Sequence, residues 1–440
     1  MSDSAPLIVD LESGLLRTEL AREAFWRAAA NGEWRIALDR PARSIARMAD
    51  ADDDEIANLP MNPDVIEAMR RRRAEGGRVV LVAAAPQPVA ARFAGALGIT
   101  DEAYGDVPAG EARAAWLRTR FGDRAPHYVG DDGAAPGVRQ AVKIPPPPQS
   151  AGAYLKAMRP HQWVKNLLVF LPVVASHKLD QSTVVMSLLA FAAFSLVASS
   201  VYLLNDLLDL AADRAHPRKR RRPMASGAVP LKHATLMMGG CLAAGFALAL
   251  PAGSHFLAVL LGYTVLTTAY SLRLKRVPVL DICVLAALYT LRIVAGAAAT
   301  GVTLSVWLLA FSIFIFLSLA AIKRQTELID NLQSGKEKPA GRGYRVGDLP
   351  IVEMMAVSAG YVAVLVLALY LNAPTVVALY ETPEFLWAVC AVLLYWISRA
   401  AMIAHRGEMN DDPIVFAFRD RVSQICGVAV LAALAAAIWS

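Results

Sequence analysis

The sequence predicts two unlike parts: an α/β domain with a doubly wound parallel sheet in residues 1–143, and an all-α membrane domain of nine transmembrane helices in residues 153–440. The composition of the 440 residues, 56% hydrophobic and 19% charged, is too apolar for an ordinary soluble chain and too charged for a purely membrane one. Residues 1–150 carry a net charge of −3 and the remainder +9. The segment 144–152 (IPPPPQSAG) is typical of a stiff linker between the two parts.

Short apolar runs that alternate with helical stretches predict the sheet of the first part. The runs are Leu7–Leu11, the β-branched RVVLVAAAP at Arg78–Pro86, and HYVGDD at His127–Asp132. Strands separated by helices favour parallel pairing with helices on both faces. The polar start of the chain shows no apolar targeting segment, so we expect this domain in the cytosol.

Nine apolar stretches predict the helices of the second part, because each is long enough, or nearly so, to cross the hydrocarbon layer. They cover residues 163–176, 182–211, 232–250, 253–272, 279–299, 304–322, 351–371, 384–402 and 421–439. The loops after the second, fourth, sixth and eighth stretches are rich in Lys and Arg, whereas the alternate loops carry only Lys178. This asymmetry predicts that the charged loops and the first domain are cytoplasmic and the C-terminus outside.

A row of acidic side chains at the end of the second predicted helix is the strongest candidate for a catalytic site. Asn205, Asp209 and Asp213 follow one another at i, i+4 and i+8 and share a helix face, with Asp206 close to it. Mg²⁺ takes hard oxygen ligands and bridges to substrate phosphates. Carboxylates in the last apolar turns of a membrane helix are costly and tend to be functional, so a solvated helix end is the weaker interpretation of these aspartates.

Basic side chains, together with one tyrosine and one asparagine, are candidates for phosphate binding, and all but Arg292 lie on the same predicted side. They lie in four groups: Arg218, Lys219 and Arg222 in the loop after the acidic row; Tyr270, Arg273, Lys275 and Arg276 in the next charged loop, before Asp281; Arg292 within a helix; and Arg159, Lys165 and Asn166 where the chain enters the membrane. Membrane anchoring explains the arginines of the first loop equally well. For the isolated Arg292 we expect a phosphate or aspartate partner, with a structural salt bridge as the alternative. The loops KRQTEL, GRGYR and HRGEMNDDP add further polar residues.

At these residues the chain resembles the UbiA superfamily of intramembrane prenyltransferases over about residues 153–440. The resemblance is carried by nine predicted helices and by the pattern Asn205-Asp206-x-x-Asp209-x-x-x-Asp213. The segments RPHQWVKN, YSLRLKR and DRAHPRKRRRP look like the decaprenyl-phosphate phosphoribosyltransferase branch. Members that use aromatic acceptors carry a second acidic pair, D-x-x-x-D, but here Asp281 is followed four residues later by Leu285.

The resemblance implies a transferase of the bacterial inner membrane and cell envelope. Mg²⁺ on Asn205, Asp209 and Asp213, with Asp206 and Asp281 as further ligands, would hold phosphoribosyl diphosphate while a polyprenyl phosphate oxygen attacks the ribose. The alternative is prenyl transfer from a polyprenyl diphosphate to an aromatic acceptor, and a membrane transporter is the rival of another class. No nucleic-acid partner is expected.

The first domain is similar to the haloacid dehalogenase (HAD) fold, whose first strand normally ends in D-x-D-G-T. The nucleophile position is kept as Asp10, the acid/base position is Glu12, and the metal-binding turn keeps Asp131 and Asp132. The hydroxyl expected after the second strand is absent, because Ala83–Ala85 stand there, and the expected lysine is also missing. Without these phosphate-holding groups a regulatory or docking role is favoured over phosphatase activity.

Overall fold

The computed structural model describes residues 5–108, 110–122, 127–130, 139–140, 150–176, 178–335, 337, 342–373, 381–409 and 412–439. The chain packs as two compact units, the first made of Met1–Pro160 with Tyr202–Cys241, the second of His161–Val201 with Leu242–Ser440. Two long helices, α10 (Gln181–Leu208) and α12 (Leu231–Ala249), contribute residues to both units. The predicted boundaries 1–143, 144–152 and 153–440 stay predictions.

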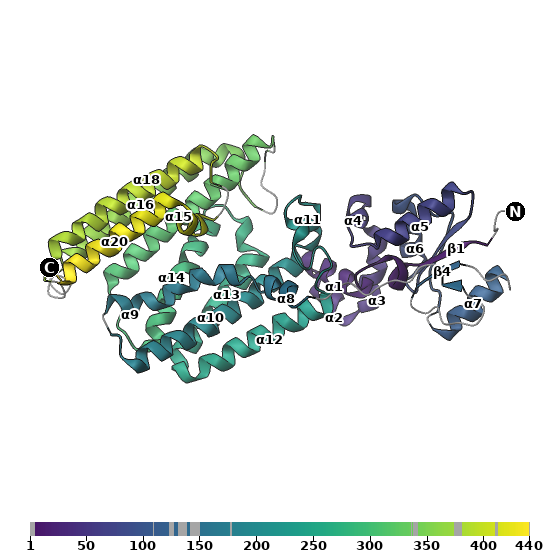
Figure 1. The fold of residues 1–440 in the computed structure, drawn as a ribbon, viewed down its shortest axis with the longest axis horizontal. Coiled ribbons are helices and arrows are strands. Elements are labelled where there is room, and N and C mark those ends of the chain that lie inside the picture. The colour runs from purple at the N-terminus through teal and green to yellow at the C-terminus, as the bar shows by residue number, and fades with distance from the viewer. Residues whose placement is uncertain are drawn as a thin grey trace. The chain divides into compact units, whose positions relative to one another are not determined.

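A five-stranded parallel sheet in the order β3-β2-β1-β4-β5 forms the core of the first unit. Its strands are β1 (Leu7–Asp10), β2 (Val79–Val82), β3 (Glu102–Tyr104), β4 (His127–Val129) and β5 (Arg139–Gln140). Alternate side chains of β1 cover opposite faces: Leu7 and Val9 pack with α5 (Pro63–Ala74) and α6 (Gln87–Leu97), and Ile8 packs with α7 (Glu111–Phe121) (Figure 1). The predicted doubly wound sheet and its three strands are confirmed, and β3 and β5 were not predicted.

Helices cover the sheet and fill a long insertion between β1 and β2. The insertion holds the π-helix η1 (Leu11–Leu15), α1 (Leu20–Ala30), α2 (Trp34–Asp39), α3 (Pro41–Ala46), η2 (Arg47–Asp50), α4 (Asp53–Ala57) and α5 (Pro63–Ala74). After β2 follow α6 (Gln87–Leu97) and α7 (Glu111–Phe121). The first unit also contains α8 (Ala151–Ala157), α11 (Leu210–Ala215) and the 3-10 turn η4 (Lys219–Arg221).

The second unit is all-helical. Beyond its parts of α10 and α12, its elements are η3 (Pro160–Phe170), α9 (Leu171–Ala175), η5 (Leu250–Ala252), α13 (Gly253–Leu272), η6 (Leu274–Arg276), α14 (Leu280–Thr300), α15 (Val306–Gln333), η7 (Val346–Asp348), α16 (Leu349–Leu371), η8 (Pro383–Leu386), α18 (Trp387–His405), α19 (Pro413–Arg419) and α20 (Arg421–Trp439). The long helices α15, α16, α18 and α20 lie side by side (Figure 1).

Six helical stretches of the described chain are long and apolar enough to cross a membrane, or seven if the bent pair α19 and α20 forms one span. One of the six, Leu231–Leu272, contains both α12 and α13. The first predicted span, residues 163–176, falls on the 3-10 helix η3 and the five-residue α9, which are too short to qualify. The count of nine is therefore not confirmed, and the orientation derived from it stays a prediction.

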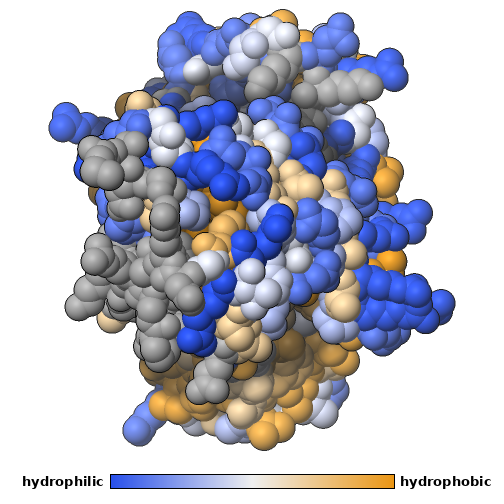
Figure 2. Space-filling model, turned by 90° about the vertical axis from the view of Figure 1, so that its right-hand side faces the viewer, coloured by the Kyte–Doolittle hydropathy of each residue, from blue (hydrophilic) through white to orange (hydrophobic). Residues whose placement is uncertain are grey.

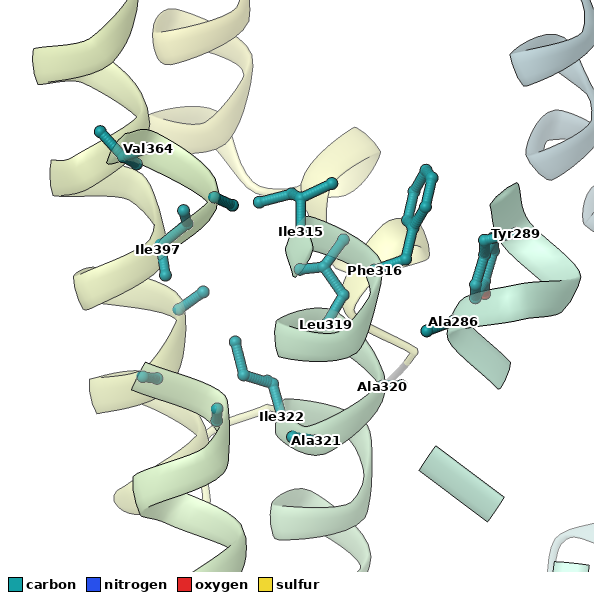
Figure 3. Close-up of a cluster of buried hydrophobic side chains, with 14 of the residues drawn as sticks. Ala286, Tyr289, Ile315, Phe316, Leu319, Ala320, Ala321, Ile322, Val364 and Ile397 are labelled. Atoms are coloured by element: carbon teal, nitrogen blue, oxygen red, sulfur yellow. The ribbon is translucent and has the colours of Figure 1, made fainter. Parts of the chain in front are cut away.

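The core of the second unit centres on α15. In Figure 3, Ile315 and Leu319 point toward α16 and α18, whereas Phe316 points toward Tyr289 of α14. The rings of Tyr289 and Phe316 stack with centroids 5.1 Å apart. Fixing α14 against α15 in this way also fixes the polar side chains that both helices carry.

Large apolar side chains remain exposed on the long helices, as a lipid-facing surface requires. Leu236, Val265, Leu365 and Leu431 are each more than half exposed. Figure 2 shows one face of the molecule, on which hydrophilic residues cover most of the upper part and apolar residues gather most densely at the lower edge. The exposed apolar side chains of the long helices therefore fit a surface that faces lipid.

Candidate active site

The acidic row lies where α10 ends and α11 begins. Asn205 and Asp206 belong to the last turn of α10, Asp209 stands between the two helices, and Asp213 belongs to α11. The amide of Asp209 donates to the carbonyl of Asn205 at 2.9 Å, and the amide of Asp213 donates to that of Asp209 at 2.8 Å. These bonds join residues four apart, so the predicted i, i+4, i+8 relation holds in the backbone although the helix is interrupted.

Two of these carboxylates converge on one guanidinium. Nη1 of Arg222 donates to Asp206 at 3.1 Å and to Asp213 at 2.5 Å, and both aspartates are 3% exposed. Arg159 also donates to Asp206, with its guanidinium above the ring of Tyr202. Arg222 was predicted beside the acidic row, whereas Arg159, predicted with Lys165 and Asn166, pairs with Asp206 instead. Charge-assisted bonds of this kind are strong.

Burial shifts the titration of one member of the acidic row, Asp213. It raises the pKa of Asp213, because the charged carboxylate loses water, while the positive charge of Arg222 opposes the shift and the nearby Asp206 adds to it. Arg218 and Lys219, by contrast, are exposed, and the Nδ1 of His216 accepts from both of their amides. These two cations remain accessible to a soluble anion.

The acidic row fits a hard cation by its donor chemistry, because carboxylate and amide oxygens are the ligands that Mg²⁺ prefers. Within the described residues no three His, Cys, Asp or Glu side chains form a ready metal cluster. Asp206 and Asp213 nevertheless converge on one cationic nitrogen, that of Arg222. Oxygens of these two carboxylates therefore lie within 3.1 Å of one positively charged nitrogen.

A second polar cluster, inside the second unit, surrounds Arg292. Its Nε donates to Oδ1 of Asn166 at 2.9 Å and its Nη2 to the hydroxyl of Tyr263 at 3.3 Å. The rings of Phe194, Tyr263 and Tyr289 lie 5.2–5.5 Å from its guanidinium carbon. These hydrogen bonds go to neutral groups, and because an amide stands where an aspartate was expected, they leave the positive charge of Arg292 uncompensated. The expected phosphate partner stays a prediction.

Lys165 belongs to the same region, because its Nζ lies 5.7 Å from the centroid of the Tyr289 ring. It donates to Asp412 at 2.8 Å, and Lys323 donates to the same carboxylate oxygen at 2.9 Å. Lys165 and Asn166 were predicted together with Arg159, and Arg292 was predicted separately as an isolated cation, whereas Lys323 and Asp412 were noticed only as parts of the loops KRQTEL and HRGEMNDDP. Among the described residues, three cations (Lys165, Lys323 and Arg292) and one carboxylate (Asp412) give this cluster an excess of positive charge suited to an anion.

Asp281 is held by a separate buried group. Its Oδ2 is 2.7 Å from Nη2 of Arg324, and the hydroxyl of Tyr344 donates to its Oδ1 at 2.7 Å. Asp281 and Arg324 are fully buried, and burial, reinforced by Asp281, raises the pKa of Tyr344. Asp281, predicted as a metal ligand, is thus occupied by an ion pair that the sequence analysis missed.

The second basic loop lies partly on the surface. Arg273 and Arg276 are exposed and Lys275 is half-buried. Tyr270 accepts from Arg342 at 2.9 Å. Gly343 is needed beside them, because a Cβ there would lie 2.1 Å from the carbonyl oxygen of Arg276.

The HAD-like centre is closed by its own side chains. Asp10, fully buried, accepts from the amide of Ser13 at 2.7 Å and from the hydroxyl of Tyr128 at 3.1 Å, and it forms an ion pair with the buried Arg113. Glu12 accepts from the amides of Ala84 and Ala85 at 3.2 and 2.9 Å. These amides follow the second strand, where the phosphate-holding hydroxyl was missing. Asp131 and Asp132 lie outside the described residues.

Comparisons with known proteins relate the two parts of the chain to two different families. The model of the UbiA prenyltransferase family matches residues 167–422, and that of haloacid dehalogenase-like hydrolases matches residues 2–132. An uncharacterized protein of Sinorhizobium fredii, y4nM, is 32% identical over 98% of this chain and 91% of its own length. The nodulation protein NoeC of Azorhizobium caulinodans is 41% identical over 62% of this chain and 89% of its own. The decaprenyl-phosphate phosphoribosyltransferase of Mycolicibacterium smegmatis is 32% identical over 67% of this chain and 95% of its own.

Proposed function

The chain belongs to the UbiA prenyltransferase family, as a multi-pass membrane transferase with an N-terminal HAD-like domain, and we propose that it transfers phosphoribose from phosphoribosyl diphosphate to a polyprenyl phosphate. The M. smegmatis relative, which carries the name of this activity, supports the proposal. The single observation that carries it is the pair of buried carboxylates on Arg222, beside the exposed cations Arg218 and Lys219. We place the reaction in the bacterial inner membrane, with the site at the cytoplasmic face.

In the proposed reaction a phosphate oxygen of the lipid attacks C1 of the ribose, a new C–O bond forms, and the bond from C1 to the diphosphate breaks. Asn205, Asp206, Asp209 and Asp213 would hold Mg²⁺, which when bound neutralises charge on the leaving diphosphate. Arg218, Lys219 and Arg222 bind the diphosphate oxygens. The protein contributes positioning and charge stabilisation, and no covalent intermediate on the enzyme is needed.

For the lipid phosphate we propose the cluster of Lys165, Asn166 and Arg292, because its positive charges exceed its negative ones and it is buried among apolar helices. A buried cation gains most from a phosphate, since the low local dielectric strengthens the attraction. Tyr270, Arg273, Lys275 and Arg276 would guide polar substrate at the membrane surface.

The alternative function is prenyl transfer from a polyprenyl diphosphate to an aromatic acceptor. That chemistry is associated with a second acidic pair, whereas Asp281 is bound by Arg324 and Tyr344. Leu285 stands four residues after Asp281, where the second aspartate of that pair would lie, and this favours a single metal-binding row and thus the phosphoribosyl reaction. A transporter is less favoured, because the acidic row and the exposed basic residues lie at helix ends.

The test is transfer of label by the purified full-length protein in detergent. With Mg²⁺, a polyprenyl phosphate and labelled phosphoribosyl diphosphate, label should move into the organic phase, and Asp209→Asn should reduce the rate at least about 100-fold. Asp348→Asn, a conservative change at the start of α16, is the matched control. Label transfer only from a labelled polyprenyl diphosphate to an aromatic acceptor would establish the alternative, and near-normal turnover of Asp209→Asn would overturn the metal assignment.

A further inference from the structure

The first helix of the HAD-like domain is joined to the segment that follows the acidic row. Glu23 of α1 accepts from both terminal nitrogens of Arg214, at 2.9 and 2.7 Å. Glu23 is 4% and Arg214 6% exposed. The hydroxyl of Thr18 donates to Glu23 at 2.6 Å and holds the carboxylate in place. A bidentate, buried pair of this kind is strong and geometrically specific.

Arg214 connects this ion pair to the turn that carries Arg222. It directly follows Asp213 in α11, and its Nε donates to the carbonyl of Ala225 at 3.2 Å. The turn is closed by the bond from the amide of Ser226 to the carbonyl of Arg222 at 2.9 Å. One guanidinium therefore ties α1 to the backbone beside the cation that binds Asp206 and Asp213.

Apolar packing fixes the same junction. Trp26, 3% exposed, belongs to one buried cluster with Leu207, Leu210 and Met224, and its indole Nε1 donates to Thr235 at 3.2 Å. Gly227 has a φ of +75°, and a Cβ there would lie 3.2 Å from a side-chain carbon of Pro60. The close approach leaves little freedom for the turn to move independently of the HAD-like domain.

We propose that the HAD-like domain positions the donor end of the transferase site, with Glu23 and Trp26 as its positioning residues. The inference rests on the proposed function and extends it to a domain whose own catalytic centre is closed. Removing the charge of Glu23 leaves Arg214 buried without its counterion. The 214–227 turn then loses its anchor, and Arg222 no longer holds its place on the two aspartates.

The test compares Glu23→Gln with Glu102→Gln in the full-length protein. Glu102 pairs with Arg78 on the sheet and makes the same change of charge away from the junction. Loss of a charged hydrogen bond predicts a rise of about 10-fold in the KM for phosphoribosyl diphosphate. The KM of Glu23→Gln for polyprenyl phosphate, and all kinetic constants of Glu102→Gln, should stay within about twofold of the wild-type values. Glu23→Asp, which keeps the charge, should show a smaller rise in the KM for phosphoribosyl diphosphate. A merely structural role would reduce the amount of active enzyme and hence kcat, leaving the donor KM unchanged.

Hydrogen exchange of residues 210–229 gives a readout that is independent of turnover. Glu23→Gln should accelerate exchange there, and Glu102→Gln should not. If Glu23→Gln fails to fold, Trp26→Phe takes its place. It keeps an aromatic ring but removes the indole N–H that donates to Thr235, and it should raise the KM for phosphoribosyl diphosphate to a smaller extent. An unchanged donor KM in a folded variant overturns the proposal. If the wild-type protein shows no transfer, the proposed function fails. Hydrogen exchange alone then tests the positioning contact: faster exchange of residues 210–229 in Glu23→Gln supports it, and unchanged exchange overturns it.

Discussion

The Nε of Arg292 donates to Oδ1 of Asn166 over 2.9 Å, and both side chains are buried within the second unit. Asn166 in turn donates to Ser195 at 3.0 Å. The amide thus orients the guanidinium without neutralising it. An aspartate at this position would cancel the charge, so the choice of asparagine preserves a cation for an anionic ligand.

Asn166→Ala should therefore destabilise the protein as well as slow transfer. It leaves a buried guanidinium nitrogen unsatisfied, which costs about 1–3 kcal/mol. The measurement is the thermal midpoint in detergent, with Asn372→Ala, at an exposed asparagine, as the control. A midpoint equal to that of the control would show that Asn166 does not support Arg292.

The buried Asp213 should make stability depend on pH. Its pKa is raised in the folded state, so its folded form binds a proton more readily than its unfolded form, and the contribution to stability is present at low pH and lost as pH rises through the folded pKa. The stability of the wild-type protein relative to Asp213→Asn, measured as the difference between their thermal midpoints, should therefore improve as the pH is lowered from neutral toward 3.8, the ordinary pKa of an aspartate.

Asp180 supplies a control of opposite sign. Hydrogen bonds from Thr183 and Ser182 lower the pKa of this exposed carboxyl. Its contribution to stability is therefore present when the pH is above the ordinary pKa of aspartate, and it is lost as the pH falls through the pKa of the folded state. Relative to Asp180→Asn, the wild-type protein should lose stability on acidification. Parallel trends for the two variants would contradict the assigned shift of Asp213.

Asp281 should prove essential for stability rather than for metal binding. Asp281→Asn removes the counterion of the fully buried Arg324, which predicts a loss of about 3–5 kcal/mol. Tyr344→Phe removes one hydrogen bond to the same carboxylate and should cost about 1 kcal/mol. Denaturant titration in mixed micelles measures both. A stable Asp281→Asn protein that needs far more Mg²⁺ for transfer would return Asp281 to the metal ligands.

The sequence predicted those parts of the site that are local along the chain. The i, i+4, i+8 spacing of Asn205, Asp209 and Asp213 follows from helix geometry, and the parallel sheet follows from β-branched runs separated by helices. The helix break at Asp209 was not predicted, because no Gly or Pro marks it.

Partners that are distant in the sequence could not be predicted. Asp412 meets Lys165 across 247 positions, and Glu23 meets Arg214 across 191. Periodicity specifies which face of a helix is buried but not which polar groups meet inside the fold. Arg324 lay in a loop noticed only for its charge, and its full burial depends on how α14 packs against α15.

The closed centre of the HAD-like domain gives a last prediction. A carboxylate that attacks phosphorus needs a free lone pair and room for the phosphate, whereas Asp10 is fully buried and bound by Arg113, Tyr128 and the amide of Ser13. We expect the wild-type protein to hydrolyse p-nitrophenyl phosphate with Mg²⁺ no faster than Asp10→Asn. The same variant should lower stability by about 3–5 kcal/mol, because Arg113 loses its buried counterion. Glu12→Gln weakens only the contacts to the amides of Ala84 and Ala85, so it should be milder. Phosphate release that depends on Asp10 would show instead that Arg113 moves aside and that the centre still works.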